Sequence, residues 1–303
     1  MPSCVYGPVP SRRLGSSLGV DLVPMKTCTI NCVYCQLGPT PQTTLDRREY
    51  VPVDKILRDV SIRLEEVAPP DYVTLGGSGE PTLHSGFGEI ARRIGAAHPD
   101  IPLCLLTNGT LMDREEVRAA CEAIQLIVPS LDAPDEETFQ RVNRPHPNLD
   151  FQSIVEGLVA LKREYEGTVW LEVFLVPGMN DAPAQIEKFA HLIDRIRPDR
   201  IQLNTAARPP AEAGVHPLSA ERREEIRDAL GERAEVIARA ADSPHAPPSG
   251  SDPQAVLDLL RRRPCTAADV ASGLGIHPNE AIKHIRMLEE EDKITRISKD
   301  QKT

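Results

Sequence analysis

Three cysteines stand close together near the start of this 303-residue chain. Cys28, Cys32 and Cys35 are spaced C-x3-C-x2-C. Thiolates are soft ligands that suit iron-sulfur centres, and three of them so close in sequence can hold three corners of a cubane cluster. One iron is then left without a protein ligand, as catalytic metals keep one position open for substrate. These cysteines are therefore the strongest candidates for chemistry in the chain.

A zinc site and a chance grouping are the alternatives to a cluster. A structural zinc ion takes four protein ligands, yet no further Cys or His occurs between Cys35 and His84. The remaining cysteines (Cys4, Cys104, Cys121 and Cys265) are scattered, and an odd total of seven fits a disulfide framework poorly. Cys104 and Cys121 lie in apolar stretches, where we expect small buried side chains. The spacing thus favours an iron-sulfur cluster over zinc.

The segment Cys28-Thr29-Ile30-Asn31-Cys32-Val33-Tyr34-Cys35 resembles the cluster-binding loop of the radical S-adenosylmethionine (radical SAM) superfamily, including the aromatic Tyr34 before the last cysteine. In that family the open iron is chelated by the amino and carboxylate groups of SAM. The reduced cluster then passes one electron to the sulfonium, and homolysis usually yields a 5′-deoxyadenosyl radical. The resemblance implies a 4Fe-4S cluster on the three cysteines, SAM as cofactor with Tyr34 among the residues that bind it, and a one-electron donor of the flavodoxin or ferredoxin type.

A glycine-rich stretch, Thr74-Leu75-Gly76-Gly77-Ser78-Gly79-Glu80-Pro81-Thr82-Leu83, follows the second expected strand. It resembles the family's SAM-binding motif, in which backbone groups accept the methionine ammonium, so the resemblance assigns Gly76, Gly77, Gly79 and Glu80 to the cofactor. Glycines let a main chain approach a ligand closely, and Glu80 can supply negative charge or brace the loop. A tight strand-to-helix turn is the alternative explanation of such a stretch.

Polar residues at other expected strand ends complete the predicted SAM site. Asn108, Ser130, Asp132 and Asn204 match positions that in the family face the carboxylate, ribose and adenine of SAM. The alternatives are an ordinary turn at Asn108-Gly109 and a helix cap at Ser130 or Asp132. The loop residue His84 is expected to be solvated, with contact to substrate as the alternative.

These residues depend on strands that alternate with helices. Six apolar, β-branched runs predict strands at Val20–Val23, Tyr72–Leu75, Pro102–Leu106, Leu126–Val128, Val169–Val176 and Ile201–Leu203. Helical spacing predicts helices around Asp54–Glu66, Gly86–Ala97, Arg114–Ala123, Phe151–Tyr165 and Ala184–Ile196. The alternation predicts a parallel sheet with its active residues at the carboxyl ends of the strands. We expect an α/β fold, a partial (β/α)6 TIM-like barrel, with a doubly wound sheet as the competing arrangement.

The C-terminal part reads as a separate unit. After a helix expected from about Ser219 to Ala240, residues 243–253 begin as a Ser- and Pro-rich linker. Helical patterns then cover Gln254–Arg263, Thr266–Leu274 and Pro278–Glu291, with Thr266 and Asp269 placed for capping, and Ile294–Ser298 resembles a short strand. We therefore predict a barrel over 1–242, a linker over 243–253 and a small winged helix-turn-helix domain over 254–303.

Charge and composition limit the partners. A net charge of −10 gives no general attraction to nucleic acid or to anionic membranes. No apolar segment approaches eighteen residues and the N-terminus lacks a signal-peptide pattern, which predicts a cytoplasmic, non-membrane protein. The C-terminal residues 251–303 carry nine Lys and Arg against nine Asp and Glu. A protein or peptide partner at this module, or packing of the module on the barrel, is expected ahead of a nucleic-acid partner. The second functional hypothesis is a redox-sensing, DNA-binding regulator.

Several strings narrow the resemblance to a wyosine-synthase-related group of radical SAM Fe-S oxidoreductases. They are Gly7-Pro8-Val9-Pro10-Ser11-Arg12-Arg13-Leu14-Gly15, Asn143-Arg144-Pro145, Val176-Pro177-Gly178-Met179-Asn180-Asp181 and Arg208-Pro209-Pro210. The second cysteine set of wyosine-type enzymes is absent, so their tRNA-modifying activity is not expected to transfer. Arg12, Arg13 and Arg144 are candidates for binding an anionic group of an unidentified substrate, with surface salt bridges as the alternative.

Overall fold

The computed structural model describes residues 3–11, 13–206, 212, 214–237, 253–262, 264–274, 276 and 278–295. Its centre is an eight-stranded sheet in which the strands follow one another in chain order. The strands are β1 (Val5–Ser11), β2 (Gly15–Val20), β3 (Tyr72–Leu75), β4 (Leu103–Thr107), β5 (Leu126–Pro129), β6 (Thr168–Leu175), β7 (Arg200–Thr205) and β8 (Ala234–Val236). β1 pairs with β2 in antiparallel fashion, and every later pair is parallel.

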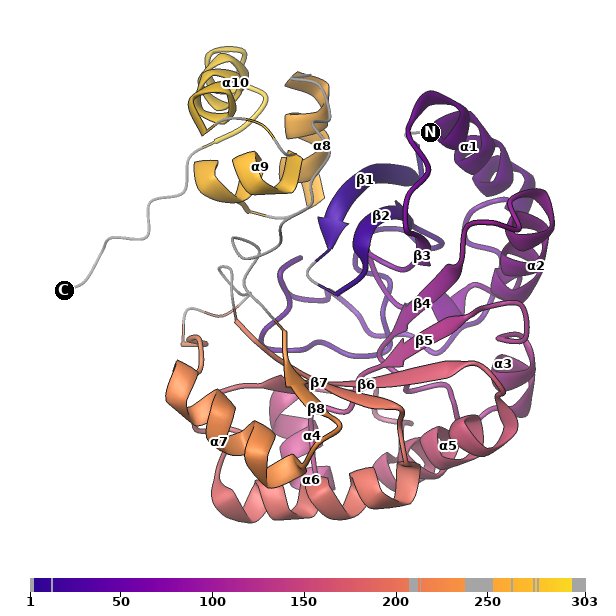
Figure 1. The fold of residues 1–303 in the computed structure, drawn as a ribbon, viewed down its shortest axis with the longest axis vertical. Helices are drawn as coiled ribbons and strands as arrows, with labels where there is room; N and C mark the ends of the chain where they lie inside the picture. The colour runs from indigo at the N-terminus through magenta and orange to yellow at the C-terminus, as the bar shows by residue number, and fades with distance from the viewer. Residues whose placement is uncertain are drawn as a thin grey trace.

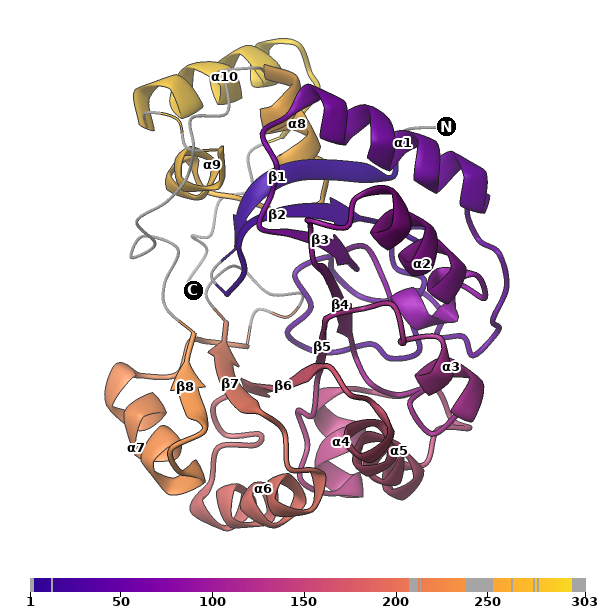
Figure 2. The ribbon, with the colours of Figure 1, turned by 45° about the vertical axis from the view of Figure 1, so that its right-hand side comes forward.

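Helices cover the outer side of the curved sheet (Figures 1 and 2). They are α1 (Val53–Glu66), α2 (Phe87–Ala97), α3 (Glu115–Ala119), α4 (Glu136–Val142), α5 (Phe151–Glu164), α6 (Pro183–Ile196) and α7 (Ala220–Leu230), with a 3-10 turn, η1 (Pro81–Leu83), after β3. In α6, Ile186, Phe189 and Ile193 are buried at helical spacing and pack into the core. The result is an α/β fold with a mostly parallel sheet, consistent with a partial barrel.

The six predicted strands are confirmed, but the bounds of the first strand and of one predicted helix need correction. Each of the six expected strands has a counterpart among β2 to β7, although the first ends at Val20 rather than beginning there. β1 and β8 were not predicted. The helix expected from Ser219 to Ala240 is wrong from Gly231 to Ile237, because Gly231 adopts φ +88° and Ala234–Val236 then pairs with Ile201–Leu203, whereas residues 238–240 fall outside the described residues. A three-residue strand is too short to show a period in sequence.

Three helices follow the barrel part: α8 (Pro253–Arg262), α9 (Ala267–Leu274) and α10 (Pro278–Glu290). They share a hydrophobic cluster of their own that includes Val256, Val270 and Leu288. The predicted cap before α9 is present, since Asp269 N–H donates to Thr266 Oγ1 at 3.1 Å and Thr266 N–H to Asp269 Oδ2 at 2.9 Å. α9 lies against β1 (Figures 1 and 2).

The expected wing strand is not seen where the chain is described. Residues 294 and 295 lie outside any strand, and 296–298 fall outside the described residues. Residues 243–252 also fall outside them, so the linker and the division into 1–242 and 254–303 stay predictions. No described helix has the length and apolar character that crossing a membrane requires.

Packing of α5 against the loop before α3 yields a test of this fold. A Cβ on Gly157 would lie 2.3 Å from the backbone nitrogen of Asp113 and 2.4 Å from the carbonyl carbon of Met112. Alanine normally favours a helix over glycine by about 1 kcal/mol. Here we expect Gly157→Ala to lower the free energy of unfolding by about 1–3 kcal/mol, because backbone must move to admit the methyl group. Urea titration monitored by circular dichroism measures the change.

The matched control is Gly95→Ala in α2. A Cβ there meets only Leu103 Cδ1, at 3.8 Å, which is an ordinary contact. This variant is expected to be more stable than the wild type by about 0.5–1 kcal/mol. Stabilisation of both variants alike would contradict the close packing of α5.

Candidate functional site

The three cysteines lie on the long connection between β2 and α1, residues 21–52, which contains no helix or strand beyond isolated bridges. The end of α4 holds one side of this cysteine loop. Asn31 N–H donates to the carbonyl of Asn143 at 2.8 Å, and Val33 N–H donates to that of Val142 at 3.0 Å. The loop therefore takes its shape from backbone contacts with a distant part of the chain.

The glycine-rich loop after β3 holds the other side. Lys26 N–H donates to the Ser78 carbonyl at 2.6 Å, and Glu80 N–H donates to the Thr27 carbonyl at 2.9 Å. A Cβ on Gly79 would lie 2.1 Å from that same Thr27 oxygen. Glycine is needed here because the two loops touch backbone to backbone.

Gly76 and Gly77 are required by conformation as well. Their φ angles are +142° and +148°, which side chains other than that of glycine rarely tolerate. A Cβ on Gly77 would also lie 2.6 Å from Asp21 Oδ1, whose carboxylate accepts the Ser78 N–H at 3.0 Å. The glycine motif therefore positions the cysteine loop, and its predicted contact with SAM stays a prediction.

Each cysteine sulfur has a nitrogen donor from a different place in the chain. The hydrogen bonds run from Lys26 Nζ to Cys35 Sγ at 3.1 Å, from Asn108 Nδ2 to Cys28 Sγ at 3.5 Å and from Asn143 Nδ2 to Cys32 Sγ at 3.3 Å. Such donors stabilise negative charge on sulfur and raise the reduction potential of a cluster ligated by it. The arrangement suits three thiolates.

Burial makes the thiolates costly unless a metal binds them. It raises the pKa of Cys28 to about 11, with the nearby negative charge of Glu80 adding to the rise. Burial raises the pKa of Cys32 well above its ordinary value, and the charge of Asp132 acts in the same direction. Binding to a metal displaces the proton and neutralises this charge. All three cysteines are free of disulfides, so the residues present fit an iron-sulfur cluster.

A mononuclear zinc site fits less well. A single ion needs its ligands to converge on one point at about 2.0–2.3 Å. Within the described part of the chain, no three His, Cys, Asp or Glu side chains are arranged in that way. A cubane spreads its protein ligands over separate irons, so the absence of a point where three ligands converge does not count against it.

Glu80 braces the glycine-rich loop to the end of β4. Its carboxylate is fully buried and accepts hydrogen bonds from Thr82 N–H at 3.0 Å, Thr107 Oγ1 at 2.7 Å and Asn108 N–H at 2.7 Å. The Thr82 hydroxyl donates as well, at 2.5 Å. Burial raises the pKa of Glu80, and these donors oppose the rise. Of its two expected roles, the structure shows the brace.

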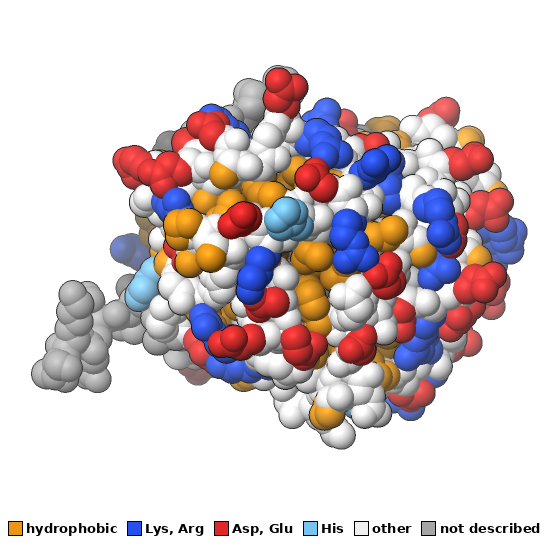
Figure 3. Space-filling model, turned by 90° about the horizontal axis from the view of Figure 1, so that it is seen from below, with side chains coloured by type: hydrophobic (Ala, Val, Ile, Leu, Met, Phe, Trp, Pro, Cys, Tyr) orange, Lys and Arg blue, Asp and Glu red, His pale blue; other side chains and the backbone are white. Residues whose placement is uncertain are grey.

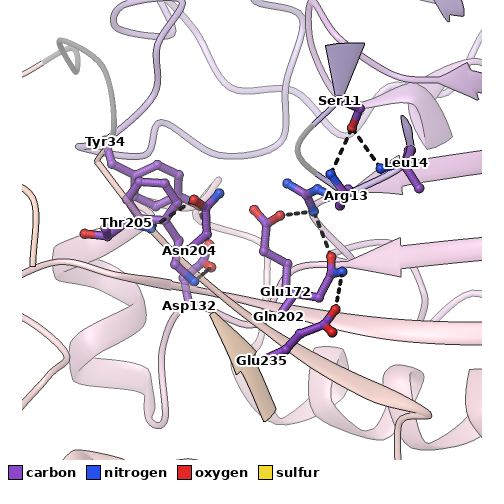
Figure 4. Close-up of polar contacts among 11 residues, drawn as sticks. Ser11, Arg13, Leu14, Tyr34, Asp132, Glu172, Gln202, Asn204, Thr205 and Glu235 are labelled. Atoms are coloured by element: carbon purple, nitrogen blue, oxygen red, sulfur yellow. Dashed lines mark hydrogen bonds and ion pairs between the residues drawn. The ribbon is translucent and has the colours of Figure 1, made fainter. Parts of the chain in front are cut away.

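Asp132 gathers a second buried network (Figure 4). It accepts the Tyr34 hydroxyl, Asn143 Nδ2 at 3.1 Å and the Phe174 N–H at 2.9 Å. The ring of Tyr34 stacks on Phe174 with centroids 3.8 Å apart. Burial raises the pKa of Asp132 to about 6, and the hydrogen bond from Tyr34 opposes the rise. This network ties the cysteine loop to β5 and β6.

A small cavity of about 10 Å³ lies beside this network. Among the residues that line it are Asn108, Ser130, Asp132 and Asn143. A volume of that size holds at most about one water molecule, so it is too small for SAM. Asn143 Oδ1 is the one buried side-chain oxygen or nitrogen without a hydrogen-bond partner in the described part of the chain.

A chamber of about 640 Å³ opens on the other side of Tyr34. It is lined by Tyr34, Cys35, Gly77 and Asn204 among the predicted site residues. The buried hydroxyls of Ser17 and Thr74, 2.6 Å apart, also line it, as does Arg13. Sites for small molecules commonly have such volumes. The chamber therefore joins the cysteine loop to the inner face of the sheet.

The structure divides the predicted residues into four groups. Cys28, Cys32 and Cys35 come together on one loop. Tyr34, Gly77 and Asn204 face the chamber, whereas Asn108, Ser130 and Asp132 surround the small cavity. Gly76, Gly79 and Glu80 support the loops. Their assignment to SAM remains a prediction.

Two supporting residues were missing from the sequence-based site. Lys26 precedes the first cysteine by two positions, a spacing that carries no signal by itself. Asn143 was noted only within the string Asn143-Arg144-Pro145, and its contact with Cys32 joins residues more than a hundred positions apart. Of the three candidate arginines, Arg13 lines the chamber, Arg144 is half-exposed and paired with Glu212, and Arg12 falls outside the described residues.

Three further predictions concern the burial of His84, Cys104 and Cys121. His84 is wholly buried, not solvated: its Nε2 lies 2.8 Å from the Val51 carbonyl, and its Nδ1 accepts the Gly86 N–H at 3.1 Å. It ties η1 to the segment before α1, a role that loop composition does not reveal. Cys104 and Cys121 are fully buried as predicted, and burial raises the pKa of each to about 12.

Comparison with known proteins gives one family. The model described as the radical SAM superfamily matches residues 22–193, which include both the cysteine loop and the glycine-rich loop. A solved structure of TYW1 with a lysine-pyruvate adduct bound has a similar fold, with a TM-score of 0.52 and 20% identity, covering 74% of this chain and 75% of that one.

Two relatives extend the similarity. The chain is 35% identical to the UPF0026 protein slr1464 of Synechocystis sp. over 68% of its own length and 76% of that protein. It is 32% identical to a protein named GTPase Obg from Brachyspira hyodysenteriae over 96% of its own length. The chain spans only 43% of the length of the Brachyspira protein.

Because Glu80 links two loops through buried hydrogen bonds, we expect its replacement by the uncharged Gln to lower the stability of the protein. Glu80→Gln places an NH2 group where the carboxylate now accepts from Thr107 or Asn108. At least one buried donor loses its partner, so we expect the free energy of unfolding to fall by about 1–3 kcal/mol. Chemical denaturation measures it. The exposed Glu156→Gln is the control, and equal stability of the two variants would contradict the brace.

His84 predicts a pH dependence of stability. Burial lowers its pKa, so the folded state resists protonation more than the unfolded state does. The contribution of neutral His84 to the free energy of unfolding is complete above about pH 6.5, the pKa of histidine in the unfolded chain. It is lost as the pH falls through the lowered pKa of His84 in the folded state. Between pH 7.5 and pH 5, the wild type should therefore lose Tm more steeply than His84→Gln.

Differential scanning calorimetry across that range tests this prediction. His191→Gln, at an exposed position of α6, controls for removal of a histidine as such. Parallel curves for the wild type and His84→Gln would show that His84 does not resist protonation in the fold.

Proposed function

The chain belongs to the radical SAM superfamily, and from this premise we propose that it is an enzyme that binds a 4Fe-4S cluster and reductively cleaves SAM to begin radical chemistry on an unidentified substrate. The observation that carries the proposal is the set of three free thiols, each with a nitrogen donor, beside a chamber of about 640 Å³. When bound, the cluster would supply one electron to SAM, and SAM would supply the 5′-deoxyadenosyl radical.

We assign the residues of this chain distinct tasks. Cys28, Cys32 and Cys35 hold three irons and provide no ligand for the fourth. Lys26, Asn108 and Asn143 stabilise the sulfur charge through their N–H groups. Lys26 is charged, and hydrogen bonds from charged groups are about twice as strong as neutral ones, so it has the largest effect.

The SAM site that we propose follows the sequence-based set. Tyr34, Gly77 and Asn204 are favoured as direct contacts because they line the chamber that Cys35 also lines. The remaining members, Gly76, Gly79, Glu80, Asn108, Ser130 and Asp132, are proposed to hold the loops that carry those contacts. A flavodoxin or ferredoxin type of electron donor belongs to the same proposal, as does a reducing, cytoplasmic setting that keeps thiols free.

No specific observation favours the DNA-binding alternative. Among the described residues of the C-terminal helices, Asn279, Glu280 and Lys283 are exposed at the start of α10, which is not a concentrated basic surface. Figure 3 shows the side of the molecule that faces away from the C-terminal helices, and there basic and acidic side chains are interspersed. We therefore propose a small-molecule enzyme, with α8, α9 and α10 as a helical module attached to it.

Anaerobic reconstitution tests the enzyme directly. Protein loaded with iron and sulfide should release 5′-deoxyadenosine from SAM when dithionite is added, as measured by liquid chromatography and mass spectrometry. Cys32→Ala should reduce the product to the level without protein, because one corner of the cluster loses its ligand. Cys265→Ala, outside the cysteine loop, is the control and should retain the activity. If the fully loaded protein yields no SAM cleavage product of any kind, the proposal is wrong.

A further inference from the structure

Arg13 and Glu172, which both line the chamber, form an ion pair. Arg13, in the turn between β1 and β2, meets Glu172 of β6, and the side chains are only 14% and 15% exposed. The same guanidinium nitrogen, Nη1, donates to Gln202 Oε1 at 3.4 Å, and Gln202 Nε2 donates in turn to Glu235 Oε1 at 2.9 Å. Figure 4 shows this row of side chains along the inner face of the sheet.

The pair is only half satisfied. Arg13 uses Nη1 for both contacts, so its Nε and Nη2 have no partner within the described part of the chain. Glu172 uses Oε2, which leaves Oε1 without a partner there. None of these atoms is sealed in the interior, and both residues line the chamber. A mostly buried ion pair is stabilised only when its remaining donors and acceptors find partners, so a ligand in the chamber would complete it.

The two charges select the kind of ligand. A carboxylate matches the fork of Nε and Nη2 on Arg13. A simple anion would, however, also lie near the negative charge of Glu172, and a simple cation would lie near Arg13. A ligand that presents both signs side by side satisfies both residues without either repulsion.

The walls limit the size of that ligand. α8 contributes Gln254, Asp258 and Leu259 to the chamber, and α9 contributes Leu274. The chamber is thus lined by α8 and α9 as well as by the sheet. A volume of about 640 Å³ suits a small molecule rather than a duplex or a folded protein.

We infer that Arg13 and Glu172 bind the substrate by an α-amino-acid head group, with its carboxylate on Arg13 and its ammonium on Glu172. This inference rests on the proposed function, since it names the substrate class for the same chamber. The reaction step is a hydrogen-atom transfer. A C–H bond of the ligand breaks homolytically, the hydrogen atom forms a C–H bond at the 5′ carbon of the deoxyadenosyl radical, and the unpaired electron passes to the ligand.

Deuterium transfer tests this inference. Reconstituted protein is given dithionite, SAM and a mixture of uniformly deuterated free amino acids. We expect 5′-deoxyadenosine, or SAM if it is regenerated, to gain one mass unit from deuterium. A parallel reaction with deuterated sugar phosphates should transfer no deuterium to 5′-deoxyadenosine. A phosphate carries no neighbouring cation, so the negative charge of Glu172 would repel it.

Variants assign the binding to the pair. Arg13→Met and Glu172→Gln should each lower the deuterated fraction of the product at least tenfold, because one charge of the head group loses its partner. Arg195→Met is the matched control: it breaks an exposed Arg–Glu pair on the outer helices and should leave the fraction unchanged. Circular dichroism confirms that each variant is folded.

The outcomes separate the two proposals. If no SAM cleavage product forms, the proposed function fails. If 5′-deoxyadenosine forms without deuterium from any amino acid, or gains it only from sugar phosphates, the proposed function stands and the assignment of the substrate class is overturned. Transfer that is equal in the wild type and in both variants would overturn the role of Arg13 and Glu172.

Discussion

The site depends on backbone hydrogen bonds that hold an irregular loop in place. Residues 21–52 contain no regular element, yet three thiols on this loop must keep fixed positions. The glycine-rich loop after β3 and the end of α4 grip it from two sides, through Ser78 and Asn143 among others. Because main-chain groups make these contacts, the side chains of the loop remain available for chemistry.

Buried charge is the second constraint on the site. Glu80 and Asp132 are both carboxylates in the interior, and each is surrounded by donors. Donors to Glu80 include groups at the end of β4, and donors to Asp132 include groups of β6 and of the end of α4. Such groups cost free energy unless every acceptor is satisfied, so each one also links the segments that donate to it. The hydrogen bonds that stabilise these buried carboxylates therefore also hold the segments of the site in fixed positions.

The chamber brings together parts of the chain that sequence keeps apart. Arg13 comes from the first hairpin, Glu172 from the middle of the sheet and Asp258 from the C-terminal helices. The sheet is curved (Figure 1), and on its inner face the side chains of Arg13 and Glu172 point toward one another (Figure 4). The C-terminal helices thereby become part of the chamber wall, in addition to having a hydrophobic cluster of their own.

The sequence alone determined the family, the grouping of three cysteines on one loop, the six strands from β2 to β7 and every described helix except α4, with α7 predicted too long, because these rest on local spacing and periodicity. It did not predict β1, β8 or α4, which are short or lack a clear period. Only the tertiary structure decided that Lys26, Asn108 and Asn143 reach the sulfurs, that His84 is buried, and that Arg13 rather than Arg144 faces the chamber. Those outcomes depend on contacts between residues far apart in the chain, where side-chain direction and burial follow from how the sheet curves and no local pattern records them.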